Sequence, residues 1–471
     1  VNCIAKLFTQ IIFFRMYELS EINNFLPESQ NGFRRNRGSL DDVFILNSII
    51  NIHFGLRKKN LYLLFIDFKQ AFDSLNHHIL WTKLKQLGFY GKMFRIIQKI
   101  YSMCTVRIRS NNSLTSQLKI SRGVIQGEIL SPLLFNLFIG NMEEYFRTNG
   151  ATGIKIDNNH DIISLGYADD LVIMGDSYTD IKKKLDLLYL YCINNELTVN
   201  VSKTKILKLG LGREPKKQRK FYFNNQEIEK VKQFDYLGIT FSRSGQFNDT
   251  VSSSIAKANA ATGTAINILC KGKSNSWKSR TYLFQSLVKS CLLYCCPVWA
   301  LRHGDQLEKV QMNYYKRLLC LPRTTPNHLI RLETDQLKLS FNILKSTLHW
   351  MFKISNSAEN SFLYLCFATL VNYSVLKPGE IKYNWFSQAK EFLKCISMDD
   401  LGPLQELVKV KRNIKITLER YKNYLIQVDL ERVSKSSFNI FWHNAVLLNE
   451  TRKYLQSSIP FKFIKIYAQI R

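Results

Sequence analysis

Two adjacent aspartates, Asp169 and Asp170, lie between two apolar arms, and this feature constrains the fold more than any other. The segment 162–175 reads Ile-Ile-Ser-Leu-Gly-Tyr-Ala-Asp-Asp-Leu-Val-Ile-Met-Gly, which is typical of a β-hairpin with both carboxylates at its turn. Two such charges between buried strands repel each other, and desolvation adds to the cost. Cations that neutralise them would give the fold a reason to keep both. The plain alternative is an ordinary hairpin turn, because Asp favours turns.

A third acidic residue, Asp67, ends the continuous apolar run Tyr-Leu-Leu-Phe-Ile at residues 62–66. Such a run predicts a strand buried on both faces, and its C-terminal end is a natural place for an active-site carboxylate. A lone Asp after a strand is more often a turn residue. Asn76 then predicts the N-cap of a helix that Gly88 closes.

If Asp67 meets the hairpin turn, the three carboxylates form a candidate metal centre. They would seat two metal ions ~4 Å apart, the arrangement used for in-line phosphoryl displacement. Ligation by oxygen alone selects hard ions, which here means Mg²⁺, with Mn²⁺ as the alternative.

The charge balance points to a polyanionic partner. Lys and Arg number 66 against 37 Asp and Glu, a formal net charge of +29. Nucleic acid fits such a surplus best, and an anionic membrane surface is the rival interpretation. No apolar run reaches the ~18–20 residues that a membrane span needs, so we expect no membrane partner. The ten cysteines are scattered, which suits a reducing compartment.

The pattern changes along the chain. Residues 1–60 look helical and basic, short strands alternate with helices from Leu61 to about Phe241, and helices follow. The fold class is therefore α+β. We expect three of the later helices at 256–269, 282–296 and 307–319. Residues 213–220 form a basic loop, either a solvated turn or a contact for phosphate. The first residue is Val1, which suggests a fragment of a longer reading frame.

A series of motifs in a fixed order resembles that of non-LTR (LINE-type) retrotransposon reverse transcriptases, over roughly residues 3–330. The palm motifs are Phe65-Ile-Asp67-Phe-Lys-Gln-Ala71-Phe72-Asp73 and Tyr167-Ala-Asp169-Asp170. The others are Gln30-Asn-Gly32-Phe33-Arg34-Arg-Asn-Arg37, Arg122-Gly123-Val-Ile-Gln126-Gly127-Glu128-Ile-Leu-Ser131-Pro132, Leu197-Thr-Val-Asn200-Val-Ser-Lys203 and Phe234-Asp-Tyr236-Leu-Gly238. Ile125, Glu128 and Asn36 depart from the usual pattern of the family.

The resemblance implies a right-hand polymerase with fingers, a palm built on an antiparallel sheet, and a helical thumb. The expected domains are fingers and palm at 1–240, thumb at 241–330 and a basic helical region of unknown role at 331–471. The implied activity is that of an RNA-directed DNA polymerase that extends a DNA 3′-hydroxyl on an RNA template by target-primed synthesis. The partners would be template RNA, primer or target DNA, and dNTPs. The implied location is intracellular, cytoplasmic as a ribonucleoprotein and nuclear during integration. The sequence does not specify an oligomeric state.

The resemblance also carries site residues over to this chain. Asp67, Asp169 and Asp170 are the implied metal ligands, and Lys203 is the implied general acid or neutralising charge for pyrophosphate. The implied nucleotide-binding residues are Arg34, Arg37, Phe68, Phe72, Gln126 and Gly127. The implied primer grip is Phe234, Tyr236 and Gly238, although an aromatic hairpin that packs on the palm is an alternative.

Three of these positions have a physical rationale. Phe72 follows Asp67 by five residues, and a bulky ring beside the incoming sugar would exclude a 2′-hydroxyl. The alternative is an ordinary core aromatic. Gly127 lets the backbone approach a base or sugar, and Gln126 would steady the nascent base pair. We expect Ser131 and Pro132 to begin the next helix.

Two rival functions remain open at this point. One is a catalytically inactive, element-derived protein that binds nucleic acid, and the intact aspartate trio argues against it. The other is an RNA-templated RNA polymerase, against which Phe72 and Tyr-Ala-Asp-Asp speak.

Overall fold

The computed structural model describes residues 3–57, 60–110, 113–210, 219–376, 384–397, 404–435, 453–457 and 459–470. The chain forms two compact units. Unit 1 comprises residues 1–238, 242–245 and 360–366, and unit 2 comprises residues 239–241, 246–359 and 367–471.

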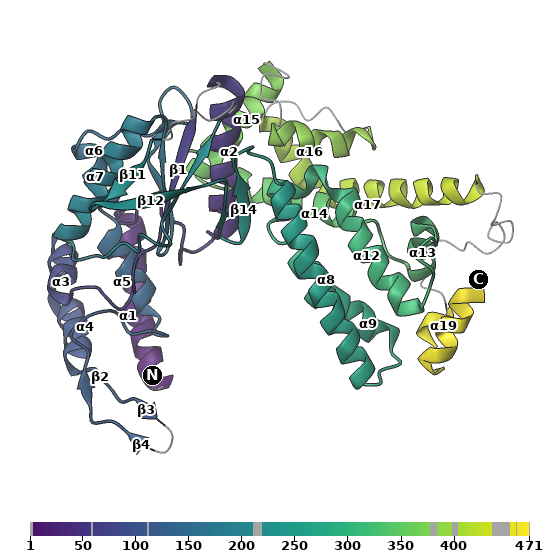
Figure 1. Cartoon of the computed structure of the whole chain (residues 1–471), viewed down its shortest axis with the longest axis horizontal. Helices are drawn as coiled ribbons and strands as arrows, with labels where there is room; N and C mark the ends of the chain where they lie inside the picture. The colour runs from purple at the N-terminus through teal and green to yellow at the C-terminus, as the bar shows by residue number, and fades with distance from the viewer. Residues whose placement is uncertain are drawn as a thin grey trace. The chain divides into compact units, whose positions relative to one another are not determined.

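Unit 1 is built on a six-stranded sheet in the order β11-β12-β10-β1-β9-β8 (Figure 1). The strands are β1 (Leu61–Ile66), β8 (Ser164–Tyr167), β9 (Asp170–Gly175), β10 (Lys205–Leu209), β11 (Phe221–Phe223) and β12 (Gln226–Val231). Neighbouring strands are antiparallel except β10 and β12, which are parallel. Every residue of β1 is buried, as the apolar run predicts.

Seven helices accompany this sheet within the described part of residues 1–238. They are α1 (Cys3–Ile22), α2 (Ser39–Arg57), α3 (His77–Gln86), α4 (Gly91–Met103), α5 (Leu130–Ile139), α6 (Met142–Thr148) and α7 (Tyr178–Asn194). Six of them, α1 and α3 to α7, share one core with the sheet that includes Leu64, Phe135 and Leu188, and α2 packs against β8 and β1. The mixture of sheet and helices confirms the α+β class.

Short strand pairs lie outside the main sheet. They are β2 (Thr105–Val106) with β5 (Leu118–Lys119), β3 (Arg109–Ser110) with β4 (Ser113–Leu114), β6 (Ile154–Lys155) with β7 (Asp161–Ile162), and β13 (Gln233–Tyr236) with β14 (Ile239–Ser242). All the residues of the first two pairs are exposed.

The predicted boundaries of α3 are confirmed. The Asn76 side chain accepts hydrogen bonds from the backbone N–H groups of His78 and Ile79. Gly88, with φ of +88°, follows the helix and donates to the carbonyl of Lys85. A cap and a left-handed glycine are local signals, so the sequence alone suffices to find them.

Unit 2 is helical. Its described helices include α8 (Asn248–Lys271), α9 (Trp277–Leu283), α10 (Ser290–Leu292), α11 (Cys296–Trp299), α12 (Gly304–Leu319), α13 (Asn327–Thr334) and α14 (Leu339–Ser355). They continue with α15 (Phe362–Leu376), which begins in unit 1, and α16 (Trp385–Lys394), α17 (Leu404–Ser434), α18 (Lys453–Gln456) and α19 (Phe461–Ile470). The expected helices 256–269 and 307–319 are present. The expected helix 282–296 is instead interrupted by a π-helix, η1 (Phe284–Lys289), and a short turn before α11.

A buried ion-pair triad ties α12, α13 and α17 together. Arg331 lies 2.9 Å from Glu308 and 2.6 Å from Asp429, with its side chain 4% exposed. Removing one member of such a group would leave a buried charge uncompensated, so the three helices depend on one another. The ion pairs therefore join residues on both sides of position 330, and the predicted domain boundaries near 240 and 330 stay predictions.

Two further predictions concern the basic loop and membrane spans. Most of the basic loop at 213–220 lies outside them. Among the described helices none is by itself long and apolar enough to cross a bilayer, although the bent pair Trp277–Leu292 and Cys296–Arg302 passes on length and composition.

Candidate active site

The strand register brings Asp67 to the aspartate hairpin. β1 pairs with β9 in antiparallel register, with Ile66 opposite Leu171, and β9 pairs with β8 so that Tyr167 lies opposite Asp170. Asp67 follows Ile66 directly, and Asp170 precedes Leu171 directly. The carboxyl end of β1 and the start of β9 therefore carry neighbouring acidic residues.

The ionisation of Asp170 responds to its burial and to the two neighbouring carboxylates. The pKa of Asp170 is raised above its ordinary value by burial, by the charge of Asp169 and by the charge of Asp67. The turn between the strands has Ala168 in the left-handed region, at φ of +60°. The convergence of all three carboxylates on one metal site stays a prediction.

The carboxylates fit a divalent cation by chemistry. Their uncompensated charge would be relieved by a hard cation with oxygen ligands. Among the described residues, however, no group of three His, Cys, Asp or Glu side chains is arranged to hold an ion as it stands. The side chains of the trio would therefore have to rotate, and their assignment as metal ligands stays a prediction.

A pocket of about 560 Å³ opens beside these residues, and its lining includes Asp67, Asp170 and Lys203. The Lys203 ammonium lies 3.8 Å from Asp67 Oδ2, and its side chain is 70% exposed. The loop before β10 holds this lysine in place, because the Asn200 N–H donates to the Asp67 carbonyl at 2.7 Å and the Asp67 N–H donates to the Thr204 hydroxyl at 3.3 Å. The role of Lys203 toward pyrophosphate stays a prediction.

Phe72 lies on the same side of the palm and is half-buried. Its ring stacks on Phe135 of α5, with centroids 4.5 Å apart, and meets the ring of Phe33 edge-on at 6.4 Å. These contacts hold the ring in one orientation. Its role as a sugar gate stays a prediction.

The Gln126–Gly127 turn is exposed at the rim of this region. The Gln126 amide donates to both carboxylate oxygens of Asp73, at 3.0 and 3.1 Å. Gly127 has φ of +78°, and a Cβ there would meet only open space. The close backbone approach is instead at Gly123, where a Cβ would lie 2.6 Å from the Asp73 carbonyl oxygen.

Two side chains that were predicted to bind the nucleotide form contacts inside the fold instead. Phe68 is 6% exposed and forms a backbone bridge with Val199, so its ring belongs to the core. The Arg34 side chain is 6% exposed, and its guanidinium binds Glu21 at 2.6 Å. In this structure the contacts of Phe68 and Arg34, which were predicted to bind the nucleotide, are structural ones. Four of the five guanidinium N–H groups of Arg34 donate to Glu21, Pro27 and Gln30.

The Arg37 side chain is partly exposed and already has two partners. Its guanidinium pairs with Glu28 at 2.6 Å and donates to the Asn31 side chain at 3.0 Å, with the arginine side chain 22% exposed. A contact between Arg37 and a triphosphate stays a prediction that would require these bonds to open.

The three residues predicted to form the primer grip have different surroundings. Phe234 stacks on Phe65 of β1, with ring centroids 4.2 Å apart and planes at 12°. Tyr236 is 3% exposed, so its ring packs on the palm and cannot touch a primer. The alternative of an aromatic segment that packs on the palm is therefore right for Tyr236. Gly238 has φ of +80°, which a turn after β13 requires.

The helix α5 starts differently from the prediction. It begins at Leu130, whose N–H donates to the Glu128 carboxylate at 2.8 Å. The Ser131 hydroxyl donates to the Ile125 carbonyl at 2.7 Å and caps nothing. Glu128, which departs from the family's pattern, therefore accepts a hydrogen bond from the first N–H group of the helix, and Ser131 does not.

Sequence reasoning gave no role to Gln30, which the structure places against the aspartate turn. Gln30 is 3% exposed, and its amide forms two hydrogen bonds with the backbone of Ala168. The residue belongs to one of the quoted motifs, but no periodicity or spacing signals a contact over 138 positions.

A mostly antiparallel sheet with acidic residues at the adjoining ends of β1 and β9 is the arrangement of a polymerase palm. Comparison with known families agrees with this. The profile of the reverse transcriptase (RNA-dependent DNA polymerase) family matches residues 1–241. The chain belongs to this family.

Curated relatives are polymerases of non-LTR retrotransposons. The chain is 26% identical over 310 residues to the Pol polyprotein of the type-2 retrotransposable element R2DM of Drosophila melanogaster, covering 63% of this chain and 28% of that protein. It is 21% identical over 323 residues to the RNA-directed DNA polymerase of the mobile element jockey of the same species, covering 67% and 34%. The chain thus spans about a third of the length of such relatives. Polymerases of this family generally use divalent metal ions.

Among solved structures, the chain is similar to telomerase from Candida tropicalis in complex with a fragment of telomeric RNA. The TM-score is 0.39 at 13% identity, over 76% of this chain and 57% of the telomerase.

The repulsion at Asp170 generates a prediction about metal-free protein. Asp170→Asn removes one of three like charges, so we expect it to stabilise the protein in EDTA by up to about 1 kcal/mol, a modest figure because the residue is partly exposed. Divalent metal at ten times its Kd should stabilise the wild type by about 1.4 kcal/mol and the variant by far less. Thermal unfolding with and without Mg²⁺ or Mn²⁺ measures both effects. Asp176→Asn, an exposed acid at the far end of β9, is the control. Equal metal stabilisation of the two variants would remove Asp170 from the ligand set.

Proposed function

We propose that this chain is an RNA-directed DNA polymerase that extends a DNA 3′-hydroxyl on an RNA template, with two Mg²⁺ ions as cofactors. The observation that carries this proposal is the strand register that brings Asp67 to Asp170 beside an open pocket, in a chain that belongs to the reverse transcriptase family. The names of the relatives, which include RNA-directed DNA polymerases, support the same activity.

The side chains of the pocket have distinct tasks in this reaction. The three carboxylates bind and orient the cation pair. When bound, such ions lower the pKa of the attacking hydroxyl and stabilise the charge on the leaving pyrophosphate. Lys203, exposed and 3.8 Å from Asp67, supplies a proton or a positive charge to the pyrophosphate. Phe72, fixed by its stacking on Phe135, excludes a ribose 2′-hydroxyl and so makes DNA the product.

The alternative of an inactive nucleic-acid-binding protein has less support. Electrostatic repulsion makes three clustered carboxylates costly to a fold that no longer binds metal. No contact in the described residues neutralises the trio except the 3.8 Å approach of Lys203. The setting in the cell follows from the resemblance alone: target-primed synthesis from a ribonucleoprotein that assembles in the cytoplasm and acts in the nucleus.

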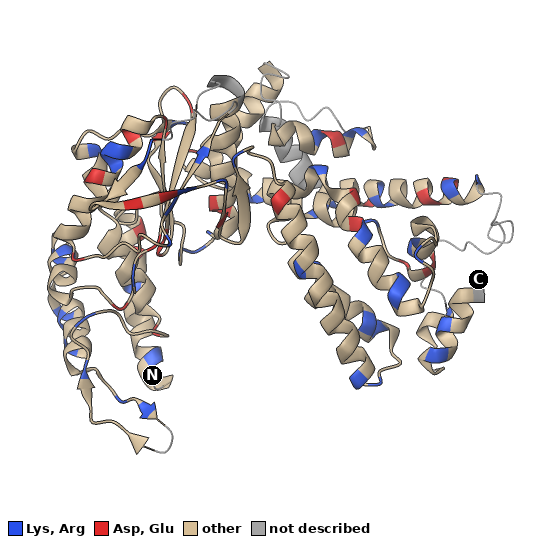
Figure 2. Ribbon diagram, viewed as in Figure 1, with Lys and Arg blue, Asp and Glu red and all other residues tan. Residues whose placement is uncertain are grey.

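A basic face on α4 is suited to hold the nucleic acid by its phosphates. Residues 74–127 contain nine lysines and arginines and no aspartate or glutamate. Lys92, Arg95 and Lys99 lie at helical spacing on the exposed face of α4, opposite buried Phe94 and Ile97. None of the three forms an ion pair with another described residue. Figure 2 shows the basic residues along α3 and α4.

Primer extension on an RNA template with dNTPs and Mg²⁺ tests the activity. We expect synthesis by the wild type and a loss of at least about 1000-fold in Asp169→Asn or Asp67→Asn, because the metal pair loses a ligand that acts in the transition state. The matched variant Asp176→Asn should retain full activity. Extension that survives both active-site changes would defeat the metal assignment. Absence of synthesis by folded wild type would favour the inactive alternative.

Competition between ribonucleotides and deoxyribonucleotides tests the gate. Phe72→Val opens space beside the sugar, so we expect the preference for dNTPs, measured as the ratio of kcat/KM values, to fall by roughly tenfold or more, which is about 1.4 kcal/mol. Phe8→Val, on an exposed position of α1, makes the same change away from the site and should leave the ratio unaltered. Unchanged sugar selectivity in Phe72→Val would mean that the ring is a core aromatic only.

The salt dependence of binding tests the basic face. Replacing Lys92, Arg95 and Lys99 together by Ala should weaken binding to an RNA–DNA duplex and reduce the slope of log K against log salt by roughly 2–3, because about three phosphate contacts no longer release counterions. The control replaces three exposed lysines on separate elements, Lys6, Lys155 and Lys182, and removes the same charge. If the two triple variants lose the same slope, net charge alone explains the binding.

A further inference from the structure

A segment from the fingers motif, residues 29–32, lies against the edge strand of the sheet. The Gly166 N–H donates to the Ser29 carbonyl at 2.8 Å, and the Asn31 N–H donates to the Gly166 carbonyl at 2.8 Å. Gln30 and Gly166 thus form a parallel bridge on β8, the strand that leads into the aspartate turn. The segment occupies the free edge next to the catalytic hairpin.

The Gln30 side chain extends this pairing into the turn itself. The Ala168 N–H donates to Gln30 Oε1 at 3.0 Å, and Gln30 Nε2 donates to the Ala168 carbonyl at 3.2 Å. The amide therefore satisfies both backbone groups of a residue at φ of +60°, a conformation that non-glycine residues adopt at a cost. Because Ala168 is followed by Asp169 and Asp170, its peptide orientation sets the direction in which both carboxylates leave the turn.

The backbone of the segment approaches the turn very closely. A Cβ at Gly32 would overlap the backbone nitrogen of Ala168, so only glycine fits there. The Gly32 N–H also donates to Gln30 Oε1 at 3.0 Å, which holds the amide in its bonding orientation. The Gly32 carbonyl accepts from the Asn136 side chain of α5 at 2.7 Å.

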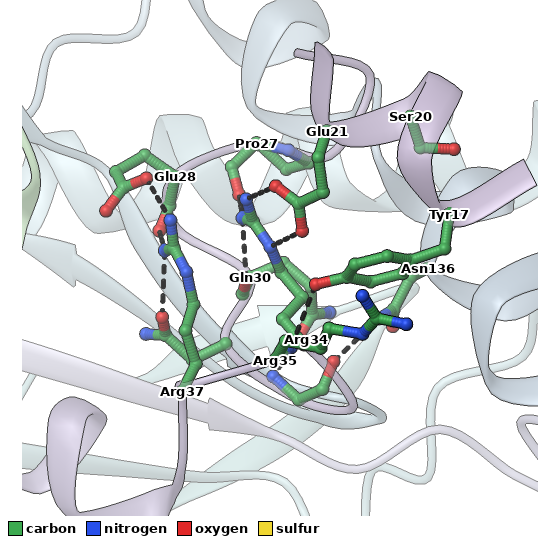
Figure 3. A network of polar contacts seen from close by, with 12 residues as sticks. Tyr17, Ser20, Glu21, Pro27, Glu28, Gln30, Arg34, Arg35, Arg37 and Asn136 are labelled. Carbon is green, nitrogen blue, oxygen red and sulfur yellow. Dashed lines mark hydrogen bonds and ion pairs between the residues drawn. The ribbon is translucent and has the colours of Figure 1, made fainter. Parts of the chain in front are cut away.

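Arginine and glutamate side chains hold this segment in place (Figure 3). Arg34 donates to the carbonyls of Pro27 at 2.9 Å and Gln30 at 3.2 Å while its guanidinium pairs with Glu21 of α1. Arg37 joins Glu28 to the Asn31 side chain in the same network.

Two further contacts complete the support. The Asn31 amide donates to Asp42 of α2 at 2.6 Å, and the Arg35 N–H donates to the Tyr17 hydroxyl of α1 at 2.8 Å. The segment is thereby fixed on three sides, by α1, α2 and α5. Among the described residues, Asp42 Oδ2 and Asn136 Oδ1 are buried without a partner, so the network is not complete, but the bonds that it does form restrict the motion of the segment.

We propose that Gln30 is a positioning residue for the catalytic aspartates, and that the network around Arg34 and Arg37 exists to hold Gln30. Gln30 touches no reacting atom. Its amide holds the Ala168 peptide so that Asp169 and Asp170 present their carboxylates to the metal site without further reorganisation. This inference rests on the proposed function, because only a metal-dependent site at the turn gives this rigidity a purpose.

The test compares Gln30→Ala with Tyr17→Phe. Both remove bonds from the same network, but only Gln30→Ala reaches the turn. We expect Gln30→Ala to lower kcat by roughly 10- to 100-fold, the loss that a misplacement of about 1 Å produces, with KM for dNTP changed by less than about threefold. The divalent metal needed for half-maximal rate should rise. Tyr17→Phe should lower the melting temperature without changing kcat or the metal requirement.

A measurement that needs no activity keeps the inference separate from the proposed function. In metal-free protein, hydrogen exchange of the backbone amides at 166–170 should be faster in Gln30→Ala than in the wild type, because the Ala168 N–H loses its acceptor. Tyr17→Phe should leave exchange in this segment unaltered. Gln30→Glu retains the acceptor and should restore protection at Ala168 while adding a repulsive charge that keeps kcat low.

Three results would overturn the inference. They are unchanged exchange at the turn in Gln30→Ala, a loss of kcat no larger than its loss of folded protein, and an equal loss in Tyr17→Phe. Failure of the proposed function has a different signature, since wild-type protein would then show no synthesis while the exchange difference at the turn persisted.

Discussion

The structure of unit 1 depends on keeping three like charges together at one end of a buried sheet. Asp67, Asp169 and Asp170 raise the free energy of the folded state through mutual repulsion and desolvation, so other interactions must hold their strands in register. β1 meets this need because it is buried on both faces and bonded on both edges, to β9 and β10. A slip of one residue would turn the whole strand over and carry its side chains to the opposite face. The apolar run that ends in Asp67 is therefore what makes the acidic cluster tolerable.

Much of this arrangement was predictable because it is encoded locally. The run at 62–66 gives a buried strand, the acidic pair between apolar arms gives a hairpin, and Asn76 and Gly88 give the ends of α3. Each signal needs only a few neighbouring residues, and each survives in the fold. The convergence of Asp67 with the hairpin was predicted from the resemblance and from the chemistry that three carboxylates share, and the raised pKa of Asp170 is consistent with it.

The failures have a common physical cause, which is competition from partners distant in the sequence. Arg34 has the charge that a triphosphate needs, but Glu21 and two backbone carbonyls occupy its donors. Tyr236 has the ring that a primer grip needs, but it packs against Phe65 and is buried. At the start of α5, Glu128 caps the helix and leaves Ser131 to bond Ile125. No spacing rule reveals which of two polar groups wins a bond when the competitor arrives by tertiary folding.

The same competition changes how the net charge of +29 should be interpreted. Arginines such as Arg34 and Arg331 form ion pairs with carboxylates inside the fold. They cannot bind a polyanion without leaving those carboxylates unpaired. The exposed cations of α4 form no ion pair with a described residue. The surrounding 54 residues, 74–127, contain no aspartate or glutamate. In the proposed function, the unpaired cations therefore contact the nucleic-acid backbone, while the paired arginines act only through the parts of the fold that they hold rigid. One residue type thus serves two separate purposes, and burial decides which.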